Sequence, residues 1–320
     1  MALSLNAWKG LSMVLFTGIT VIGAVVAVLM KEKAQQIYVT CGVMFSAGVL
    51  LAGGFVHMLG DSSEQFEEYA PNFPWAFAVA GGTVVLLAVV EIAMERVLED
   101  VLLPGAKKDN TEEKSGDAGG EERMNGKSYQ EADADDDEDD EASHVHDASP
   151  RDASHVHDVL LDDGTNPFSA ILLTLVLGIH VLIEGMGLGA QVDVSEFGTA
   201  FIAIAIHKGF VAFALAENLV TSGYWQERSR RKYFYLSLGL FILMTLVGIA
   251  IGWGISGSGE ESIATAILTA MMSGSFIYVA ILEILPHETK IIKRERLAVI
   301  PVLFFFVAGY CLMALLAVWA

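Results

Sequence analysis

Two ionisable side chains, His180 and Glu184, lie four residues apart in an otherwise apolar run from Leu175 to Leu188. A spacing of four places both side chains on one face of a helix. Imidazole nitrogen and carboxylate oxygen are ligands that suit zinc and ferrous iron. The alternative is a buried hydrogen bond between them that only ties helices together. Because an ionisable group in an apolar span is costly without a partner, the pattern favours a metal site.

The next apolar segment contains two more ionisable residues, His207 and Lys208. His207 can supply a third metal ligand from a neighbouring helix. Lys208 lies about ten residues inside its segment, too deep for its alkyl stem to carry the ammonium group to water. We therefore expect Lys208 to face the same polar region and to pair with a carboxylate such as Glu184. Its charge would also fill the space in which a second metal ion could bind.

The elements that must position these side chains are long apolar segments. The chain has 320 residues, of which 53% are hydrophobic, and its mean hydropathy is +0.51, which excludes an ordinary soluble protein. Backbone groups in lipid must bond to one another within the segment, so each segment is expected to be a helix. The sequence predicts an all-α membrane protein with about eight transmembrane helices, at residues 8–30, 37–59, 74–97, 168–190, 197–221, 233–255, 263–285 and 298–319.

Charge divides the chain and orients it. Most of the acidic excess behind the net charge of −20 lies in residues 99–163, a composition typical of disorder. We therefore expect helices 1–3 in residues 1–98, an acidic loop at 99–166, and helices 4–8 in residues 167–320. Lys and Arg occur in the loops after the odd-numbered helices and are absent from the loops after helices 2, 4 and 6. The positive-inside rule then predicts a cytosolic acidic loop and two extracytosolic termini.

The acidic loop contains a short duplication, residues 142–147 against 153–158. It supplies four imidazoles that are candidate metal contacts, His144, His146, His155 and His157. Such tracts bind metal weakly, and the alternative is a solvated linker that happens to contain histidines. No pattern of basic and aromatic residues indicates nucleic-acid binding.

Four groups of residues, taken in order, resemble the signature motifs of the ZIP (ZRT/IRT-like) family of divalent metal transporters, in its His-Lys, animal-type branch. They are Ser46–Ala52 with His57–Asp61, His180–Gly185 with Gly187–Gln191, His207–Gly209, and Ser275–Tyr278 with Leu282–Pro286. The motifs extend over nearly all of the membrane part, and the long His-bearing loop is also similar to that family.

The resemblance implies uptake of zinc or ferrous iron into the cytosol as transported substrate, with no prosthetic group. It implies that His180, Glu184 and His207 bind the ion in the middle of the bilayer. It also implies pathway roles outside that set, with His57 and Asp61 near the extracellular entrance, Lys208 beside the ligands, and Glu283 toward the cytosol.

The chain departs from the family pattern at three positions. Val181 and Val211 stand where two-metal members of the family carry further polar ligands, and Gly60 replaces the helix 2 proline. We therefore expect one main site with three protein ligands and an open position for water or a transient ligand. Metal binding should weaken in acid, because ligating histidines must be neutral. Alternating access would expose the site first to the outside and then to the cytosol.

Two other functions compete with transport. A His/Glu site could activate water in an intramembrane zinc-dependent hydrolase, although the chain has no H-E-x-x-H motif. A metal-sensing scaffold would depend on the loop, so deleting residues 105–163 would abolish its function, whereas a transporter would keep basal flux. We expect no enzyme activity, a plasma-membrane location, and the metal ion and lipid bilayer as partners. The sequence leaves the assembly open between a monomer and a homodimer.

Overall fold

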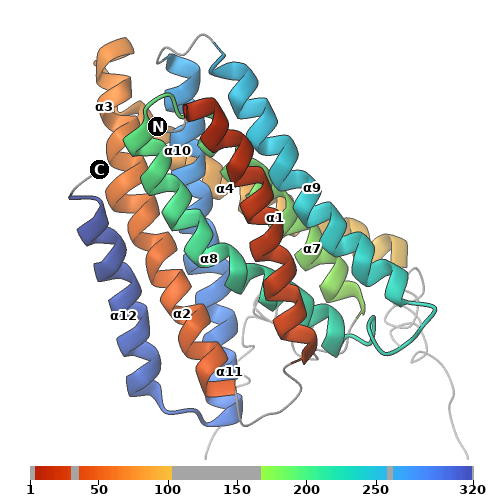
Figure 1. Ribbon diagram of the computed structural model, residues 1–320. Helices are drawn as coiled ribbons and strands as arrows, with labels where there is room; N and C mark the ends of the chain where they lie inside the picture. The colour runs from red at the N-terminus through yellow and green to blue at the C-terminus, as the bar shows by residue number, and fades with distance from the viewer. Residues whose placement is uncertain (1–3, 30–35, 103–166, 258–261, 319–320) are drawn as a thin grey trace, which may run out of the picture.

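The computed structural model describes residues 4–29, 36–102, 167–257 and 262–318, and the regular elements in these ranges are helical (Figure 1). They are α1 (Leu5–Leu29), α2 (Gln36–Ala52), η2 (Gly53–Met58), α3 (Leu59–Tyr69), α4 (Trp75–Leu102), α7 (Pro167–Ala190), α8 (Val194–Thr221), α9 (Arg231–Ile255), α10 (Ile263–Tyr278), η3 (Val279–Ile284), α11 (Leu285–Glu295) and α12 (Val299–Leu316). The two η elements are short π-helical turns. The predicted loop contacts His144, His146, His155 and His157 lie outside the described residues.

Eight helical stretches within the described ranges are long and apolar enough to cross a membrane, which confirms the predicted all-α membrane fold. Two boundaries were predicted wrongly. The helix expected at 37–59 continues to Tyr69, and the helix expected at 263–285 continues to Glu295. Both extensions are amphipathic: in α3, Leu59 and Phe66 are buried while neighbouring glutamates face outward. A search for apolar runs stops where such a helix becomes polar on one face.

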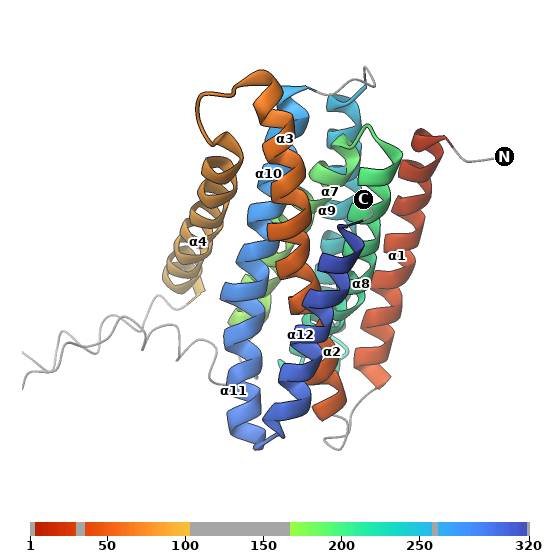
Figure 2. The same cartoon turned by 90° about the vertical axis from the view of Figure 1, so that its left-hand side faces the viewer.

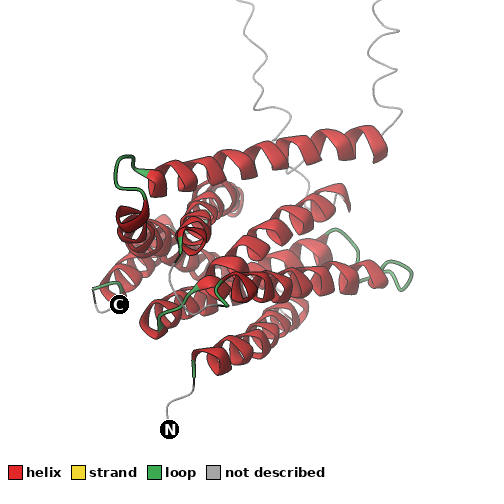
Figure 3. Cartoon of the chain, turned by 90° about the horizontal axis from the view of Figure 1, so that it is seen from above, coloured by secondary structure: helices red, strands yellow, loops and turns green. Residues whose placement is uncertain are grey.

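The helices pack as two groups. In one group, α7 packs mainly on α9 and α1 on α8; in the other, α2 packs on α12 and α10 on α4. The main contacts between the groups join α10 to α7 and α2 to α8. Figure 2 shows the continuous α2–α3 and α10–α11 rods running the length of the molecule, and Figure 3 shows the bundle from one end.

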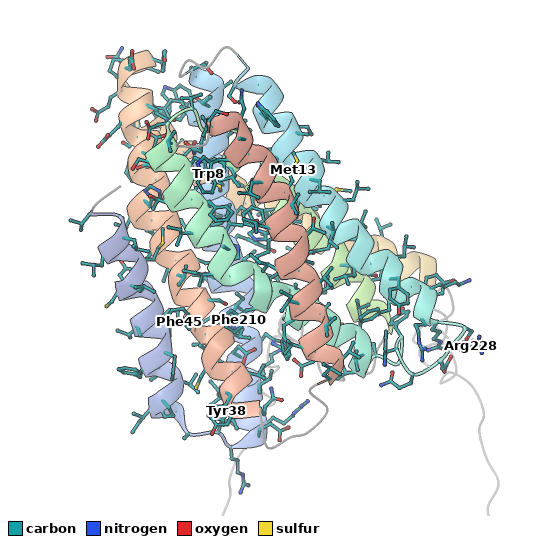
Figure 4. The ribbon with its side chains drawn as sticks, in the orientation of Figure 1. Trp8, Met13, Tyr38, Phe45, Phe210 and Arg228 are labelled. Carbon is teal, nitrogen blue, oxygen red and sulfur yellow. The ribbon has the colours of Figure 1, made fainter. Side chains whose placement is uncertain are left out.

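Successive spans alternate in direction, so the loops fall at two ends. Trp8, near the start of α1, lies at the upper end in Figure 4, whereas Tyr38 at the start of α2 and Arg228 in the α8–α9 loop lie at the lower end. The other strongly basic segment, α11 with its Lys293 and Arg294, is also at the lower end (Figure 1). The two basic connections are therefore on the same side of the bundle, as the charge pattern requires.

Glycines bring α7 and α9 together. A Cβ added to Gly189 would lie 2.2 Å from the carbonyl oxygen of Ile249, and one added to Gly252 would lie 2.0 Å from that of Met186. Gly185 and Gly248 face each other one turn earlier on the two helices, with similarly short distances. Each helix thus carries a pair of glycines four residues apart, a spacing that lets backbones approach closely in lipid. This pairing holds the helix that bears His180 and Glu184.

Candidate metal centre

Two helices of one packing group supply the polar side chains at the centre of the bundle. Helix α7 contributes His180 and Glu184, one turn apart, and α8 contributes His207 and Lys208. All four side chains are about 1% exposed. The structure therefore brings together the four residues that the sequence singled out first, although two of them come from a separate helix.

Glu184 contacts the other three side chains. Its Oε2 atom lies 3.1 Å from Nε2 of His207 and 3.4 Å from Nε2 of His180. Its Oε1 atom accepts a hydrogen bond of 2.9 Å from Nζ of Lys208. The predicted pairing of Lys208 with Glu184 is confirmed by this contact. One carboxylate oxygen thus faces the imidazoles while the other faces the ammonium group.

The hydrogen bond on the far side of the His207 ring fixes its tautomer. Nδ1 of His207 lies 2.7 Å from the carbonyl oxygen of Ala203. A carbonyl oxygen can only accept, so Nδ1 must donate, and in neutral His207 the lone pair is on Nε2. That lone pair faces Oε2 of Glu184. Two acceptors at 3.1 Å need a cation between them, either a proton or a metal ion.

His180 is oriented by a side chain from the other helix group. Its Nδ1 atom lies 2.6 Å from Oγ of Ser275 on α10. Its Nε2 atom, on the side of Glu184, is buried without a hydrogen-bond partner among the described residues. A buried imidazole nitrogen that makes no hydrogen bond, and that lies 3.4 Å from a carboxylate oxygen of Glu184, is available as a ligand together with that oxygen.

Aromatic rings enclose the cluster. The Phe276 ring lies edge-on to His207, with ring centroids 5.2 Å apart. Nζ of Lys208 lies 5.4 Å from the ring centroid of Phe16 and 5.2 Å from that of Phe241, within the range of cation–π attraction. These apolar walls lower the effective dielectric around the cluster, which strengthens the electrostatic interactions inside it.

The ligand atoms have spacings that suit zinc. Zinc in tetrahedral coordination has bonds of about 2.0–2.2 Å to nitrogen and oxygen, so its ligand atoms lie roughly 3.3–3.6 Å apart. One candidate atom from each of His180, Glu184 and His207 lies within 4.8 Å of the other two, and two of the separations are 3.1 and 3.4 Å. Within the described ranges these three residues form the one group of three or more His, Cys, Asp or Glu side chains that could hold a metal ion.

The residues predicted for the extracellular entrance lie apart from this cluster. Nδ1 of His57 is 3.2 Å from Oδ2 of Asp61, and the pair spans the junction of η2 and α3. His57 is buried and its Nε2 atom has no partner among the described residues, whereas the side chain of Asp61 is 22% exposed. The pair therefore connects the buried η2 turn to the partly exposed start of α3.

Glu283, predicted on the way to the cytosol, is also separate from the cluster. It lies in η3, and its Oε1 atom is buried without a hydrogen-bond partner among the described residues. The hydroxyl of Tyr278, the last residue of α10 before η3, donates a hydrogen bond to a carboxylate oxygen of Glu91 on α4. A second polar group thus links α4 to the junction of α10 and η3.

Sequence reasoning missed two polar contacts. Ser275 stood in one of the quoted motifs, but nothing in its own spacing indicated a contact with His180. Lys9 lies close to the predicted start of the first span, yet it is only 2% exposed and donates a hydrogen bond of 3.0 Å to Oγ of Ser256. That hydroxyl in turn bonds to the carbonyl oxygen of Gly189 at the end of α7. Lys9 thus ties α1 to the ends of α7 and α9.

Comparison with known proteins agrees with this geometry. The model of the family described as ZIP zinc transporter matches residues 5–317. Zinc transporter ZIP1 of Takifugu rubripes is 33% identical over 154 residues, 48% of this chain and 48% of that protein. Human zinc transporter ZIP2 is 32% identical over 162 residues, again 48% of each, and protein zntD of Dictyostelium discoideum is 30% identical over 162 residues, 50% of this chain and 23% of that protein. The chain spans about half the length of the first curated relatives it matches. Because the family match extends over nearly all of its residues, the chain belongs to the ZIP zinc transporter family.

Proposed function

We propose that this protein carries a divalent metal ion, zinc in the first place and ferrous iron as a second substrate, across the membrane into the cytosol. His180, Glu184 and His207 would bind the ion at the centre of the bundle, and the chain would belong to the His-Lys branch of its family. Relatives named zinc transporters and the fit of the three ligand atoms to zinc support the choice of ion.

The observation that carries this proposal is the pair of acceptors formed by Nε2 of His207 and Oε2 of Glu184, 3.1 Å apart. Their arrangement suits a cation, and Nε2 of His180, which makes no hydrogen bond among the described residues and lies 3.4 Å from the same carboxylate oxygen, provides a third ligand atom for it. Three protein ligands leave a fourth position for water or for a transient ligand, as a mobile ion requires.

Lys208 would limit the site to one ion. Its ammonium group is bonded to Oε1 of Glu184, so it occupies the side of the carboxylate that a second metal ion would need. It also neutralises Glu184 before metal arrives. When zinc binds, the one acidic ligand is already paired, so the charge of the ion is only partly compensated. This arrangement favours release over permanent binding.

The path of the ion would run along the interface between the two helix groups. His57 and Asp61 would receive metal at the upper end, and Glu283 would accept it on the way to the lower end, where the acidic loop of residues 99–166 would lie. Movement of one helix group against the other would change the side from which the site is reached. The same proposal includes the division of the chain into helices 1–3 in residues 1–98, the acidic loop in residues 99–166, and helices 4–8 in residues 167–320.

The competing hydrolase function has no support from the relatives, which are named transporters rather than enzymes. The polar residues also favour transport, because they recur on η2, α3, α4, η3, α7 and α8 instead of gathering around one reaction centre. A path through a membrane needs polar groups at several depths, whereas a single hydrolytic site does not.

Uptake of radiolabelled zinc and ferrous iron tests the proposal in cells that express wild-type protein or His207→Ala at matched surface amounts. We expect zinc to accumulate with the wild type and not with the variant, because two ligands hold zinc far less tightly than three. Cys41→Ala serves as the control, since Cys41 is buried in α2 in a hydrophobic group with Met44 and Val302, and none of the metal-site residues belongs to that group. Equal uptake by wild type and His207→Ala would refute the ligand set, and no uptake of either metal by the wild type would refute the transport function.

The plasma membrane and a homodimer complete the proposal. Surface biotinylation of intact cells tests the location. Chemical crosslinking of the protein in membranes tests the assembly, and a crosslinked species of twice the monomer mass is expected. A protein that is protected from biotinylation, or that stays monomeric at all crosslinker concentrations, would contradict the respective part.

A further inference from the structure

Ser275 is a buried hydroxyl that touches the candidate metal centre from outside its own helix group. The residue is 0% exposed, and its Oγ atom lies 2.6 Å from Nδ1 of His180. Ser275 belongs to α10 and His180 to α7, and these helices form one of the two main contacts between the helix groups. A ligand on one group is therefore oriented by a residue on the other.

The hydroxyl is chemically suited to this role. An imidazole that binds metal through Nε2 carries its proton on Nδ1 and needs an acceptor there. Oγ of Ser275 can accept a hydrogen bond from that N–H, and its own O–H can donate to Nδ1 when Nδ1 is unprotonated. Partners on the far nitrogen set the tautomer and direction of a ligating histidine, and their loss typically lowers metal affinity or activity about 10- to 100-fold.

The two histidines differ in how they are held. His207 bonds through Nδ1 to the carbonyl oxygen of Ala203, four residues earlier in the same helix, so this bond moves with α8. The bond of His180 to Ser275 crosses from α7 to α10 and depends on how the two helix groups are packed. Any displacement of α7 along α10 acts on His180 and leaves the support of His207 unchanged.

The rest of the α7–α10 contact shows how close this packing is. Nε2 of Gln191, just after α7, donates a hydrogen bond of 3.2 Å to Oγ1 of Thr269. A Cβ added to Gly187 would lie 2.7 Å from Cβ of Met272. The seam therefore runs along α10 from Thr269 through Met272 to Ser275, and Ser275 is the point on it that bonds to a candidate ligand.

We propose that Ser275 is a positioning residue for the transported metal ion, a role that rests on the proposed function. It holds the His180 ring in the direction that presents Nε2 to zinc while α7 and α10 are packed as they are here. A shift of one helix group against the other breaks this bond and loosens one of three ligands. Binding at the site and packing between the groups are thereby linked through one hydroxyl.

Zinc uptake measured over a range of zinc concentrations tests this role in the full-length protein. The variants are Ser275→Ala, which removes the hydroxyl, and the pair Ser275→Thr and Ser275→Val, which have the same shape with and without it. We expect Ala and Val to raise the KM for zinc about 10-fold or more, and Thr to stay within about twofold of the wild type. The purified proteins should show the same order in the rise of Tm that added zinc produces.

Ser273→Ala is the matched control. Ser273 is also 0% exposed and lies two residues earlier in α10. Its hydroxyl, however, donates a hydrogen bond of 3.0 Å to the carbonyl oxygen of Gly54, which is outside the cluster. This variant can lower the amount of protein in the membrane, and its KM should stay that of the wild type.

Several outcomes would overturn the role of Ser275. One is an equal KM for Ser275→Ala and Ser273→Ala, and another is an equal KM for the Thr and Val variants. If Ser275→Ala does not reach the membrane, the Thr and Val pair decides. A wild type that moves no zinc would refute the proposed function instead. The rise of Tm with added zinc in the purified variants is measured separately and still tests the role of Ser275.

Discussion

At the residue scale, Glu184 is a carboxylate with two different partners on its two oxygens. Lys208 neutralises it through Oε1, and His207 and His180 approach Oε2. Burying a charge without a partner is expensive, and removing one member of a buried ion pair typically destabilises a protein by about 3–5 kcal/mol. Lys208 therefore acts on stability as well as on the binding of metal.

The substitution Lys208→Met tests this double role. We expect the purified variant to be less stable than the wild type in the absence of zinc by about 3–5 kcal/mol, because Glu184 is left as an unpaired buried charge. Added zinc should restore more stability to the variant than to the wild type, since the ion supplies the missing positive charge. Thermal unfolding in detergent, with and without zinc, measures both effects.

Lys9→Met is the control for this measurement. Lys9 is another buried lysine, and its ammonium group donates a hydrogen bond to the hydroxyl of Ser256 and not to a carboxylate. The loss of the Lys9 ammonium group leaves no buried anion behind. Added zinc should therefore stabilise Lys9→Met no more than it stabilises the wild type. An unchanged Tm of Lys208→Met without zinc would contradict the role assigned to the Lys208–Glu184 pair.

At the scale of elements, close contacts between glycines decide which helices pair. Gly252 of α9 lies so near Met186 of α7 that no side chain fits between them. In lipid, where helices gain little from hiding apolar side chains, such contacts and the dispersion they allow supply much of the association. The pairing of α7 with α9 positions the helix that carries His180 and Glu184.

The substitution Gly252→Val tests this contact. A Cβ there would lie 2.0 Å from the carbonyl oxygen of Met186 and 2.8 Å from the amide nitrogen of Ala190. We expect a loss of about 1–3 kcal/mol or more, typical of overpacking, seen as a lower Tm and less folded protein in the membrane. Gly254→Val is the control, because nothing lies within 4 Å of a Cβ at that exposed position. Equal stability of the two variants would show that the backbones can separate at no cost.

At the scale of the whole molecule, the two ends differ in charge. The α8–α9 connection with Arg228 and Arg230, and α11 with Lys293 and Arg294, lie at the lower end of the bundle. The α3–α4 connection at the upper end contains no Lys or Arg. From the positive-inside rule we predict that the lower end faces the cytosol.

Cysteine labelling tests this orientation. In a background without Cys41 and Cys311, the variants Asn72→Cys and Arg228→Cys each carry a single thiol at an exposed loop position. We expect a membrane-impermeant maleimide to label Asn72→Cys on intact cells, and Arg228→Cys only after the membrane is permeabilised. The reverse pattern would invert the orientation, and labelling of both positions from outside would contradict an odd number of spans between them.

The sequence alone was sufficient wherever the physics is local. The length of an apolar segment predicts a transmembrane helix, because in lipid the backbone groups can form hydrogen bonds only within the same helix. The spacing of four residues predicts that His180 and Glu184 share a helix face. Local patterns failed at the ends of α3 and α11, where an apolar run gives way to an amphipathic helix whose partner is elsewhere in the chain. The motifs were enough for the family.

Only the tertiary structure decided which helices meet. His207 and Lys208 reach Glu184 because α8 lies beside α7, and Ser275 reaches His180 because α10 crosses from the other helix group. The same holds for Lys9, whose hydrogen bond joins residues 247 positions apart. Such contacts depend on the sum of many weak packing interactions between distant segments, and no single spacing along the chain records that sum.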